Sequence, residues 1–273
     1  MIDTHVHFWQ YDEVRDSWID DSMEVIRKDF LPSDIEELLV SNSVEGIVAV
    51  QADQSLTETR LLLDLAENNP KILGVVGWID FLSDNFEEQL QTFRKYSKLK
   101  GWRHIVQAEP EGFLAYPQFV DNIRKLKAYN YTYDILVYYS QMGEAIEFAE
   151  KLPEQKLVLD HMGKPDLKTP EIALWEKNIA ALAKCENVYC KLSGLVTEAE
   201  KGKWTKETLE PYLDVIFKYF GTSRIMFGSD WPVMLLNTNY EEWTQLVKDY
   251  IQKFSKEEQH QILSGNAVDF YNL

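Results

Sequence analysis

The sequence predicts an α/β protein that folds as a single (β/α)₈ (TIM) barrel domain spanning residues 1–273. Three observations lead to this prediction. Short β-branched or apolar runs alternate with stretches of helical spacing. The length suits one barrel of roughly 250 residues. Polar side chains gather at the C-terminal ends of the apolar runs. A doubly wound open sheet is the alternative, but no glycine-rich nucleotide-binding motif follows an early strand.

The apolar runs define eight expected strands. In chain order they are Ile2–Phe8, Gly46–Gln51, Ile72–Ile79, Lys100–Val106, Tyr131–Val137, Lys156–His161, Val188–Leu192 and Arg224–Gly228. Strands that alternate with helices imply right-handed crossovers and a parallel sheet.

The helices between the strands carry start signals and amphipathic spacing. Ser33-x-x-Glu36, Ser55-x-x-Glu58 and Ser255-x-x-Glu258 each place a hydroxyl where it can accept an N–H of the first helical turn. Pro170 fits a first helical position. The clearest helical spacing lies in the last third of the chain, at Tyr240, Trp243, Leu246, Val247, Tyr250, Ile251 and Phe254. One face of that helix is therefore expected to be buried.

Composition excludes several classes of function. With 45% hydrophobic and 27% charged residues the chain is expected to be globular rather than disordered. Its 28 basic and 45 acidic residues give a net charge of −17, which repels nucleic acid and anionic lipid. The N-terminus lacks the basic and apolar regions of a signal peptide, and no run approaches the length of a membrane span. We expect a cytoplasmic protein whose partner is a small molecule.

The connection from Trp9 to Pro32 is longer than a usual strand-to-helix loop and is rich in aromatic residues. In a barrel it would overhang the C-terminal face. It is therefore expected to form a lid or a wall for substrate, or else a satellite hydrophobic cluster beneath an ordered loop.

Two histidines on the first expected strand and one on the sixth suggest a metal or substrate site. His5 and His7 are two residues apart, so on a strand their imidazoles point to one face in parallel and can hold one divalent ion or one substrate oxygen. A pair satisfied by backbone carbonyls is the alternative. His161 ends the sixth strand before a Gly and Pro turn, which favours a site residue over a core histidine. Asp160 is expected on the opposite face, as an orienting or structural group.

The eighth and fourth strands end in a carboxylate and a guanidinium. Asp230 can take a proton from water and return it to a leaving group, although it can also cap the following turn. Arg103 offers a planar fork to a carboxylate or a developing oxyanion, with a structural pair to Asp80 or Glu109 as the alternative. His104 alternates to the other face and is expected to be structural.

Taken together, seven segments resemble the amidohydrolase superfamily. They are Asp3-Thr4-His5-Val6-His7-Phe8-Trp9, Val50-Gln51-Ala52, Gly74-Val75-Val76-Gly77-Trp78-Ile79-Asp80, Gly101-Trp102-Arg103-His104, Leu159-Asp160-His161-Met162-Gly163-Lys164-Pro165, Lys191-Leu192-Ser193-Gly194-Leu195 and Gly228-Ser229-Asp230-Trp231-Pro232. More closely they resemble its branch of sugar-acid lactonases and pyrone-dicarboxylate hydrolases. The resemblance runs from residue 3 to residue 267.

The resemblance implies roles for these positions. His5, His7, His161 and Asp230 are expected to hold a metal ion if one is present. Asp230, His161 and Arg103 are expected to be catalytic. The expected substrate contacts are Gln51, Asp80, Trp78, Tyr138 and Trp9. Many superfamily members complete a metal pair with a lysine or histidine on the fourth or fifth strand, and Tyr131–Val137 has neither. We expect at most one divalent ion, with zinc the first candidate, and the branch also includes members that work without metal.

The expected reaction is hydrolysis of a lactone ring, of the sugar-acid (aldonolactone) type, by water that Asp230 activates. Two alternatives keep the same fold. One is a metal-dependent, non-oxidative decarboxylase of an aromatic acid, and the other is a non-catalytic barrel that binds a sugar acid or a metal.

Overall fold

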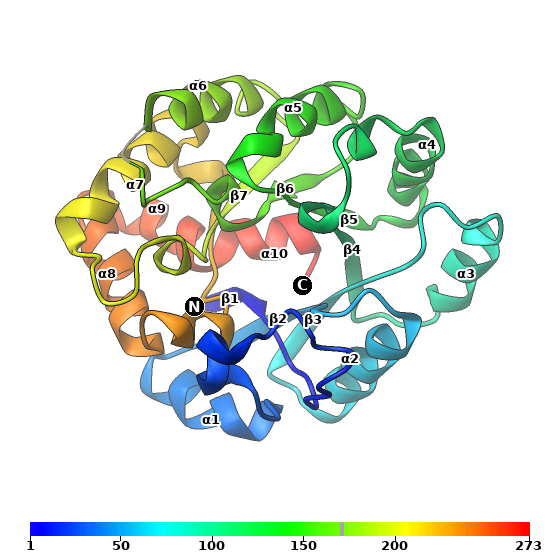
Figure 1. The fold of residues 1–273 in the computed structure, drawn as a ribbon, viewed down its shortest axis with the longest axis horizontal. Coiled ribbons are helices and arrows are strands. Elements are labelled where there is room, and N and C mark those ends of the chain that lie inside the picture. Colours follow the sequence, from blue (N-terminus) through cyan, green and yellow to red (C-terminus); the bar gives the residue numbers. More distant parts are fainter. Residues whose placement is uncertain (170–171) are drawn as a thin grey trace.

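Eight parallel strands form one sheet whose spatial order follows the order of the chain, from β1 to β8. The computed structural model describes residues 1–169 and 172–273. The strands are β1 (Ile2–Val6), β2 (Gly46–Val50), β3 (Ile72–Gly77), β4 (Leu99–Ile105), β5 (Thr132–Leu136), β6 (Leu157–Leu159), β7 (Val188–Leu192) and β8 (Ile225–Phe227). Figure 1 shows them as a ring inside a ring of helices. The predicted (β/α)₈ barrel is confirmed.

Helices follow the strands and cover the outside of the barrel. They are α1 (Pro32–Ser41), α2 (Leu56–Asn68), α3 (Phe86–Phe93), α4 (Pro117–Lys125), α5 (Met142–Glu150), α6 (Ile172–Leu182), α7 (Lys206–Phe220), α8 (Tyr240–Ile251), α9 (Lys256–His260) and α10 (Asn266–Tyr271). The amphipathic pattern predicted for α8 is confirmed, although Phe254 lies beyond the helix end and stacks on Phe217. Among the helices of the described residues, none is both long and apolar enough to cross a membrane.

Helix starts agree with the sequence pattern in two of three cases. Ser55 and Ser255 precede α2 and α9, and the side chain of each accepts the backbone N–H three residues on. The prediction that Ser33 begins a helix is wrong, because α1 already starts at Pro32, whose fixed φ angle suits the first helical position. The prediction for Pro170 falls outside the described residues.

Several strands end earlier than the sequence predicts. β1 ends at Val6, β6 at Leu159 and β8 at Phe227, so His7, His161 and the residues around Asp230 lie in the segments that follow. Apolar composition predicted the strands well, since residues buried on both faces of a parallel sheet form continuous apolar runs. The polar residues beyond them take other backbone conformations, which lets them reach the barrel axis.

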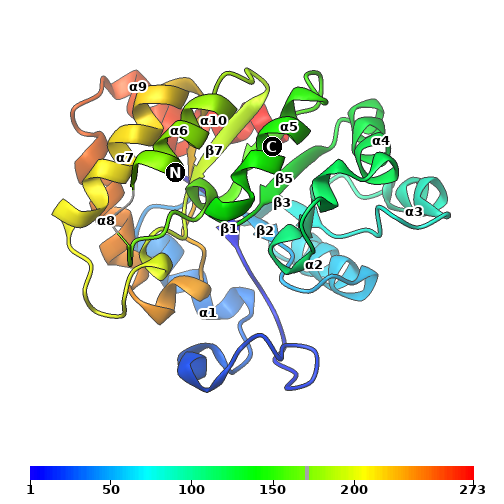
Figure 2. The ribbon, with the colours of Figure 1, turned by 45° about the horizontal axis from the view of Figure 1, so that its top comes forward.

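The N-terminal end of the barrel is closed by α10, which lies across the ring in Figure 1. Its residues join a buried apolar cluster with side chains of the barrel interior: Ile2, Val48, Val50, Val76, Val158, Met226, Ala267, Phe270 and Tyr271. In Figure 2 the excursion that follows β1, in deep blue, stands out on the side away from α10. Access to the interior is therefore from the C-terminal end of the strands, where sites on this fold lie.

The ring closes between the first and last strands. Thr4 donates its hydroxyl hydrogen to the Phe227 carbonyl at 2.7 Å, and the N–H of His7 donates to the Trp231 carbonyl at 2.7 Å. The N–H of Asp230 donates to the His5 carbonyl at 2.9 Å. We call this set of contacts the seam. It places His5 of β1 and the following His7 directly beside the aspartate that follows β8.

Candidate active site

Three imidazoles and one carboxylate meet at the C-terminal end of the barrel. The Nε2 atoms of His5 and His7 are 3.2 Å apart, and His7 Nε2 lies 3.3 Å from Asp230 Oδ1. The rings of His5 and His161 are 4.4 Å apart between centroids, and His161 Nδ1 lies 3.9 Å from Asp230 Oδ2. All four side chains are buried. The structure thus brings together the four residues that the sequence pattern singled out.

His5 and His7 differ from the arrangement that a regular strand would give. Their ring planes lie at 77° to each other instead of parallel, because His7 stands one residue past the end of β1. His7 Nδ1 lies 2.7 Å from the backbone carbonyl of Val50 at the end of β2. The Nε2 atoms of His5 and His7 therefore point toward each other and toward the Asp230 carboxylate.

The segment after β8 is shaped by a glycine and a buried carboxylate. A Cβ on Gly228 would lie 3.0 Å from the Cβ of His5, so this close approach to β1 depends on glycine. Asp3 accepts hydrogen bonds from the N–H of Ser229 at 2.9 Å and from the hydroxyl of Tyr240 at 2.8 Å. Burial raises the pKa of Asp3 to about 6, although these donors oppose the shift. Asp230 itself has a left-handed backbone, with φ of 65°.

Asp160 and His161 both face the site, although strand alternation predicts opposite faces for them. His161 has φ of 53°, so it leaves the strand geometry immediately after β6 and turns back over His5. Asp160 Oδ1 lies 3.4 Å from His5 Nδ1, on the inside of the barrel. The prediction of opposite faces is wrong because the left-handed residue breaks the two-residue period. Asp160 is nevertheless positioned to orient His5.

Arg103 on β4 reaches the same cluster. Its Nη1 donates to Asp160 Oδ2 at 3.0 Å and lies 3.1 Å from His5 Nε2. Its Nη2 donates to the carbonyl of Gln51 and to Gln51 Oε1. The guanidinium is therefore paired with Asp160, and neither alternative partner, Asp80 or Glu109, is used. Within the described residues, Arg103 Nε is buried without a hydrogen-bond partner.

Sequence reasoning missed a buried ion pair beneath the histidines. Lys191 on β7 contacts the carboxylate of Asp134 on β5, and its Nζ lies 3.0 Å from Asp160 Oδ1 and 3.2 Å from His5 Nδ1. Both side chains are fully buried. The hydroxyl of Tyr271 in α10 donates to Asp134 Oδ2 at 2.9 Å. The available signal was a lysine and an aspartate inside otherwise apolar strands.

The buried charges shift the ionisation of the cluster. Burial holds the pKa of His5 well below its ordinary value, with Asp160 opposing the shift and Lys191 adding to it. Burial and the neighbouring His5 likewise lower the pKa of His161. Burial alone would raise the pKa of Asp160, but the charge of Lys191, the contact with His5 and the charge of Arg103 outweigh it and hold that pKa well below the usual range. His5 and His161 are therefore neutral and Asp160 is ionised at neutral pH.

A cavity of about 720 Å³ opens above the cluster. Among its walls are His7, Arg103, His161 and Asp230, so the cavity reaches the histidine cluster. The remaining lining residues are Trp18, Met23, Ala52, Gln54, Ile105, Gln107, Ala108, Leu136, Tyr138, Lys164, Lys168, Thr197, Glu198, Val233 and Leu236. Its size suits a small organic molecule.

The predicted substrate contacts are placed unequally around this cavity. Tyr138 lines it, whereas Gln51 is buried behind Arg103. Trp78 donates its indole N–H to His104, and Asp80 caps the N–H of Leu82, so neither forms part of the lining. His104 has the structural surroundings expected of it, since it also pairs with Glu109 and stacks on Phe113. Trp9 lies one layer further out.

The segment from Trp9 to Pro32 supplies part of the cavity wall. Trp18 and Met23 line the cavity, while the indole of Trp9 packs edge-on against Trp18 and Phe30. Ile19 and Ile26 are buried beneath. One side of this ordered segment therefore forms the expected cavity wall, and its other side forms the expected hydrophobic cluster.

Lys164 and Glu198 form a charged pair on the cavity wall that the sequence did not single out. Lys164 Nζ lies 3.5 Å from Glu198 Oε1, and both side chains are largely buried. Burial raises the pKa of Glu198, although Lys164 opposes the shift. A carboxylate and an ammonium on one wall can accept from and donate to neighbouring hydroxyl groups of a ligand.

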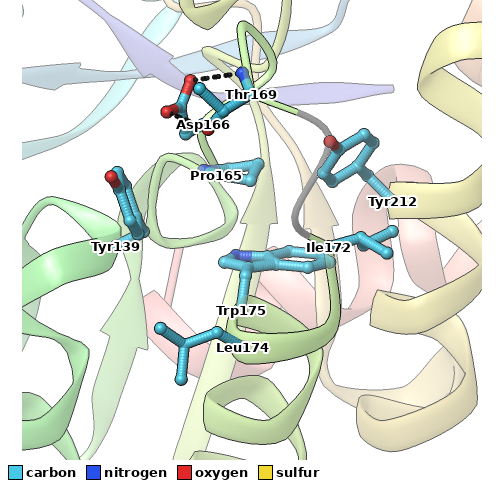
Figure 3. A pocket seen from close by; sticks show the side chains of 8 residues that line it. All are labelled: Tyr139, Pro165, Asp166, Thr169, Ile172, Leu174, Trp175 and Tyr212. Carbon is cyan, nitrogen blue, oxygen red and sulfur yellow. Dashed lines mark hydrogen bonds between the residues drawn. The ribbon is translucent and has the colours of Figure 1, made fainter.

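A much smaller pocket of about 60 Å³ is lined mainly by residues of α6 and of the segment 165–169. Figure 3 shows its lining, in which the backbone N–H of Thr169 donates to Asp166 Oδ1 at 3.2 Å. The pocket is too small for a sugar, and none of the clustered histidines or Asp230 lines it. The main cavity is the better candidate site.

The histidine cluster has the donor types and spacing of a metal site. Two ligands of a tetrahedral zinc ion lie about 3.3 Å apart. His5 Nε2 to His7 Nε2 at 3.2 Å and His7 Nε2 to Asp230 Oδ1 at 3.3 Å match this spacing. Ligand atoms of His5, His161 and Asp230 also lie within 4.8 Å of one another. The residues present therefore fit one divalent ion.

Comparison with known proteins places this site in a family. The amidohydrolase family model matches residues 2–273. The chain belongs to the amidohydrolase family. An L-fucono-1,5-lactonase of Burkholderia multivorans is 36% identical over the whole chain and 96% of that protein. An L-rhamnono-gamma-lactonase of Scheffersomyces stipitis is 23% identical over 89% of this chain and 79% of that protein.

The fold is close to that of a solved amidohydrolase. A crystal structure of an amidohydrolase from Burkholderia multivorans with bound zinc superposes with a TM-score of 0.96 at 36% identity, and covers 100% of this chain and 99% of that one. A second crystal form, with bound HEPES, matches equally well. The amidohydrolase resemblance seen in the sequence motifs is confirmed.

Proposed function

We propose that this protein hydrolyses the lactone of a sugar acid. The observation that carries the proposal is the Asp230 carboxylate, which faces the cavity beside His7 Nε2 and close to the buried guanidinium of Arg103. A carboxylate that can move a proton, set beside imidazole groups and a cationic donor, suits acyl transfer to water. The 36% identity to an L-fucono-1,5-lactonase supports a sugar acid lactone as the substrate class.

Water is activated by Asp230 in the proposed reaction. The carboxylate takes a proton from a water molecule as the water oxygen attacks the ring carbonyl carbon. Charge develops on the carbonyl oxygen, and N–H groups of Arg103 and His161 stabilise it. Asp230, now protonated, returns the proton to the ring oxygen as the carbon–oxygen bond breaks. The product is the open hydroxy acid.

A divalent ion, when bound, would be held by His5, His7, Asp230 and His161. It would polarise the lactone carbonyl as a Lewis acid. The protein makes three contributions whether or not the ion is bound. It holds Asp230 in the left-handed turn after β8, orients the rings through Val50 and Ser193, and keeps the cluster shielded beneath the cavity.

The cavity walls agree with a polyhydroxylated ligand. Glu198, Lys164 and Tyr138 offer polar groups on one side, and Met23, Val233 and Leu236 offer apolar contacts. We propose that the polar groups bind the ring hydroxyls, and that the apolar side holds the carbon skeleton. Specificity would then depend on residues outside the catalytic cluster.

The test is acidification of weakly buffered lactone solutions, with a panel of aldonolactones that includes L-fucono-1,5-lactone. The protein is assayed after chelation and again with added zinc. Asp230→Asn should abolish turnover, whereas Asp121→Asn, the same change on an exposed position of α4, should retain it. Full activity of Asp230→Asn would contradict the assigned role. Release of carbon dioxide from an aromatic acid, without lactone hydrolysis, would contradict the proposed reaction.

A further inference from the structure

The hydrogen bonds of His7 determine which of its nitrogens carries the proton. Nδ1 of His7 lies 2.7 Å from the Val50 carbonyl oxygen, which can only accept. The proton of neutral His7 is therefore on Nδ1, and its Nε2 is an acceptor. The same Nε2 is directed at His5 Nε2, 3.2 Å away. For this contact to be a hydrogen bond, His5 must carry its proton on Nε2.

Lys191 completes this pattern on the other side of His5. With the proton on Nε2, His5 Nδ1 has a lone pair, and the Lys191 ammonium donates to it at 3.2 Å. Lys191 is held in place by the carboxylate of Asp134, which also accepts from Tyr271. The donors and acceptors from Lys191 through His5 and His7 to Val50 then all agree. In this tautomer neither His5 nor His7 has a lone pair free for a metal ion.

A second set of contacts favours the opposite tautomer of His5. Asp160 Oδ1 is buried, and it lies 3.4 Å from His5 Nδ1 and 3.0 Å from Lys191 Nζ. Nη1 of Arg103 lies 3.1 Å from His5 Nε2. If the proton moves to Nδ1, His5 can donate to Asp160 and Nε2 can accept from Arg103. The lone pairs of His5 and His7 would then face each other, which is favourable only with a cation between them.

We propose that Lys191 and Asp160 select between two tautomers of His5, one for a metal-free site and one for a metal-bound site. Lys191 supports the proton on Nε2 and the hydrogen bond to His7. Asp160 supports the proton on Nδ1 and frees both Nε2 atoms for a divalent ion. Both are positioning residues, because each acts on the site through His5. In other metal sites, a carboxylate that accepts the remaining N–H of a metal-bound histidine orients its ring in this way.

The proposal predicts a change in tautomer when Lys191 is removed. Because Lys191→Met alone leaves the Asp134 carboxylate buried with only Tyr271, the variant to use is the double substitution Asp134→Asn with Lys191→Met. Nitrogen NMR of ¹⁵N-histidine-labelled protein distinguishes protonated from bare ring nitrogens, and the His5 signals are assigned by their loss in His5→Gln. We expect Nε2–H in zinc-free wild type and Nδ1–H in the double variant.

Zinc binding gives an independent readout by calorimetry with the metal alone. The double variant should bind zinc at least about tenfold more tightly than wild type. Lys164→Met is the charge control, because it removes a cation from the cavity wall without a contact to His5. It should leave the His5 tautomer unchanged.

Either of two results overturns the proposal: the same His5 tautomer in wild type and the double variant, or a zinc affinity in the double variant no tighter than in Lys164→Met. Asp160→Asn provides the reciprocal test, in which wild-type tautomer should persist even with zinc added. These measurements need no substrate, so their outcome is independent of the proposed lactonase activity.

Discussion

A methyl group added at Gly194 should displace His161 and disable the site. Gly194 follows β7, and a Cβ on it would lie 2.5 Å from His161 Nδ1, whereas ordinary contacts begin at 3.4 Å. The imidazole must therefore move by about 0.9 Å, the difference of these two distances. Displacements of about 1 Å in a catalytic group cost on the order of 10²-fold in rate. We expect Gly194→Ala to lower kcat on the lactone by that factor.

The matched control separates this clash from backbone strain. Gly194 has φ of 61° and Gly202 has φ of 69°, so alanine at either position costs roughly 1–2 kcal/mol of folding free energy. A Cβ on Gly202 meets nothing within 4 Å. Gly202→Ala should thus lose stability in urea unfolding and keep kcat. Equal kcat values for the two variants would refute the reasoning that the position of His161 matters for turnover.

Two further predictions concern buried carboxylates. Burial raises the pKa of Glu58 from 4.5 to about 8, although the N–H groups of Asp53 and Ala52 oppose the shift. The folded state thus binds this proton more tightly than the unfolded state, so wild type should lose stability relative to Glu58→Gln as pH rises from 4.5 to 8, by up to about 5 kcal/mol. Urea unfolding of both proteins at several pH values measures the difference, and a pH-independent difference would contradict the shift. Tyr271→Phe removes a hydroxyl donor from the buried carboxylate of Asp134 and should cost about 1.5–3 kcal/mol in the same assay. An unchanged urea midpoint would show that this hydrogen bond contributes nothing.

The sequence predicted the barrel because its strands are buried on both faces. Val48, Val76 and Val158 belong to short continuous apolar runs, which are typical of strands buried on both faces of a parallel sheet. The helices between them have a clear amphipathic period. Strand ends were less predictable. His7 and His161 read as continuations of strands, but their backbones turn where the barrel opens, and such turns depend on tertiary contacts.

The site was predictable where polar residues stand at strand ends, and unpredictable where charges lie inside strands. His5 and Asp230 are polar residues in or just after apolar runs, and the resemblance to a known family strengthened their assignment to the site. Lys191 and Asp134 are single charged residues in apolar runs. The role of each depends on the other, which lies 57 residues away in the sequence. The energy of a buried ion pair depends on both charged residues and on the dielectric around them, and the local sequence pattern shows neither the pairing nor the dielectric.

The seam between the first and last strands is a place where the barrel can open locally. Thr4 and Phe227 are 223 residues apart, so this junction joins the most distant parts of the barrel. Local opening there would separate His5 and His7 from Asp230 while leaving most helices in place. A ligand that contacts residues on both sides of the seam stabilises the closed state and so raises the free energy of that opening. Amide hydrogen exchange at His7 and Asp230 should therefore slow with occupancy, so that the backbone of the seam reports whether the cavity is filled.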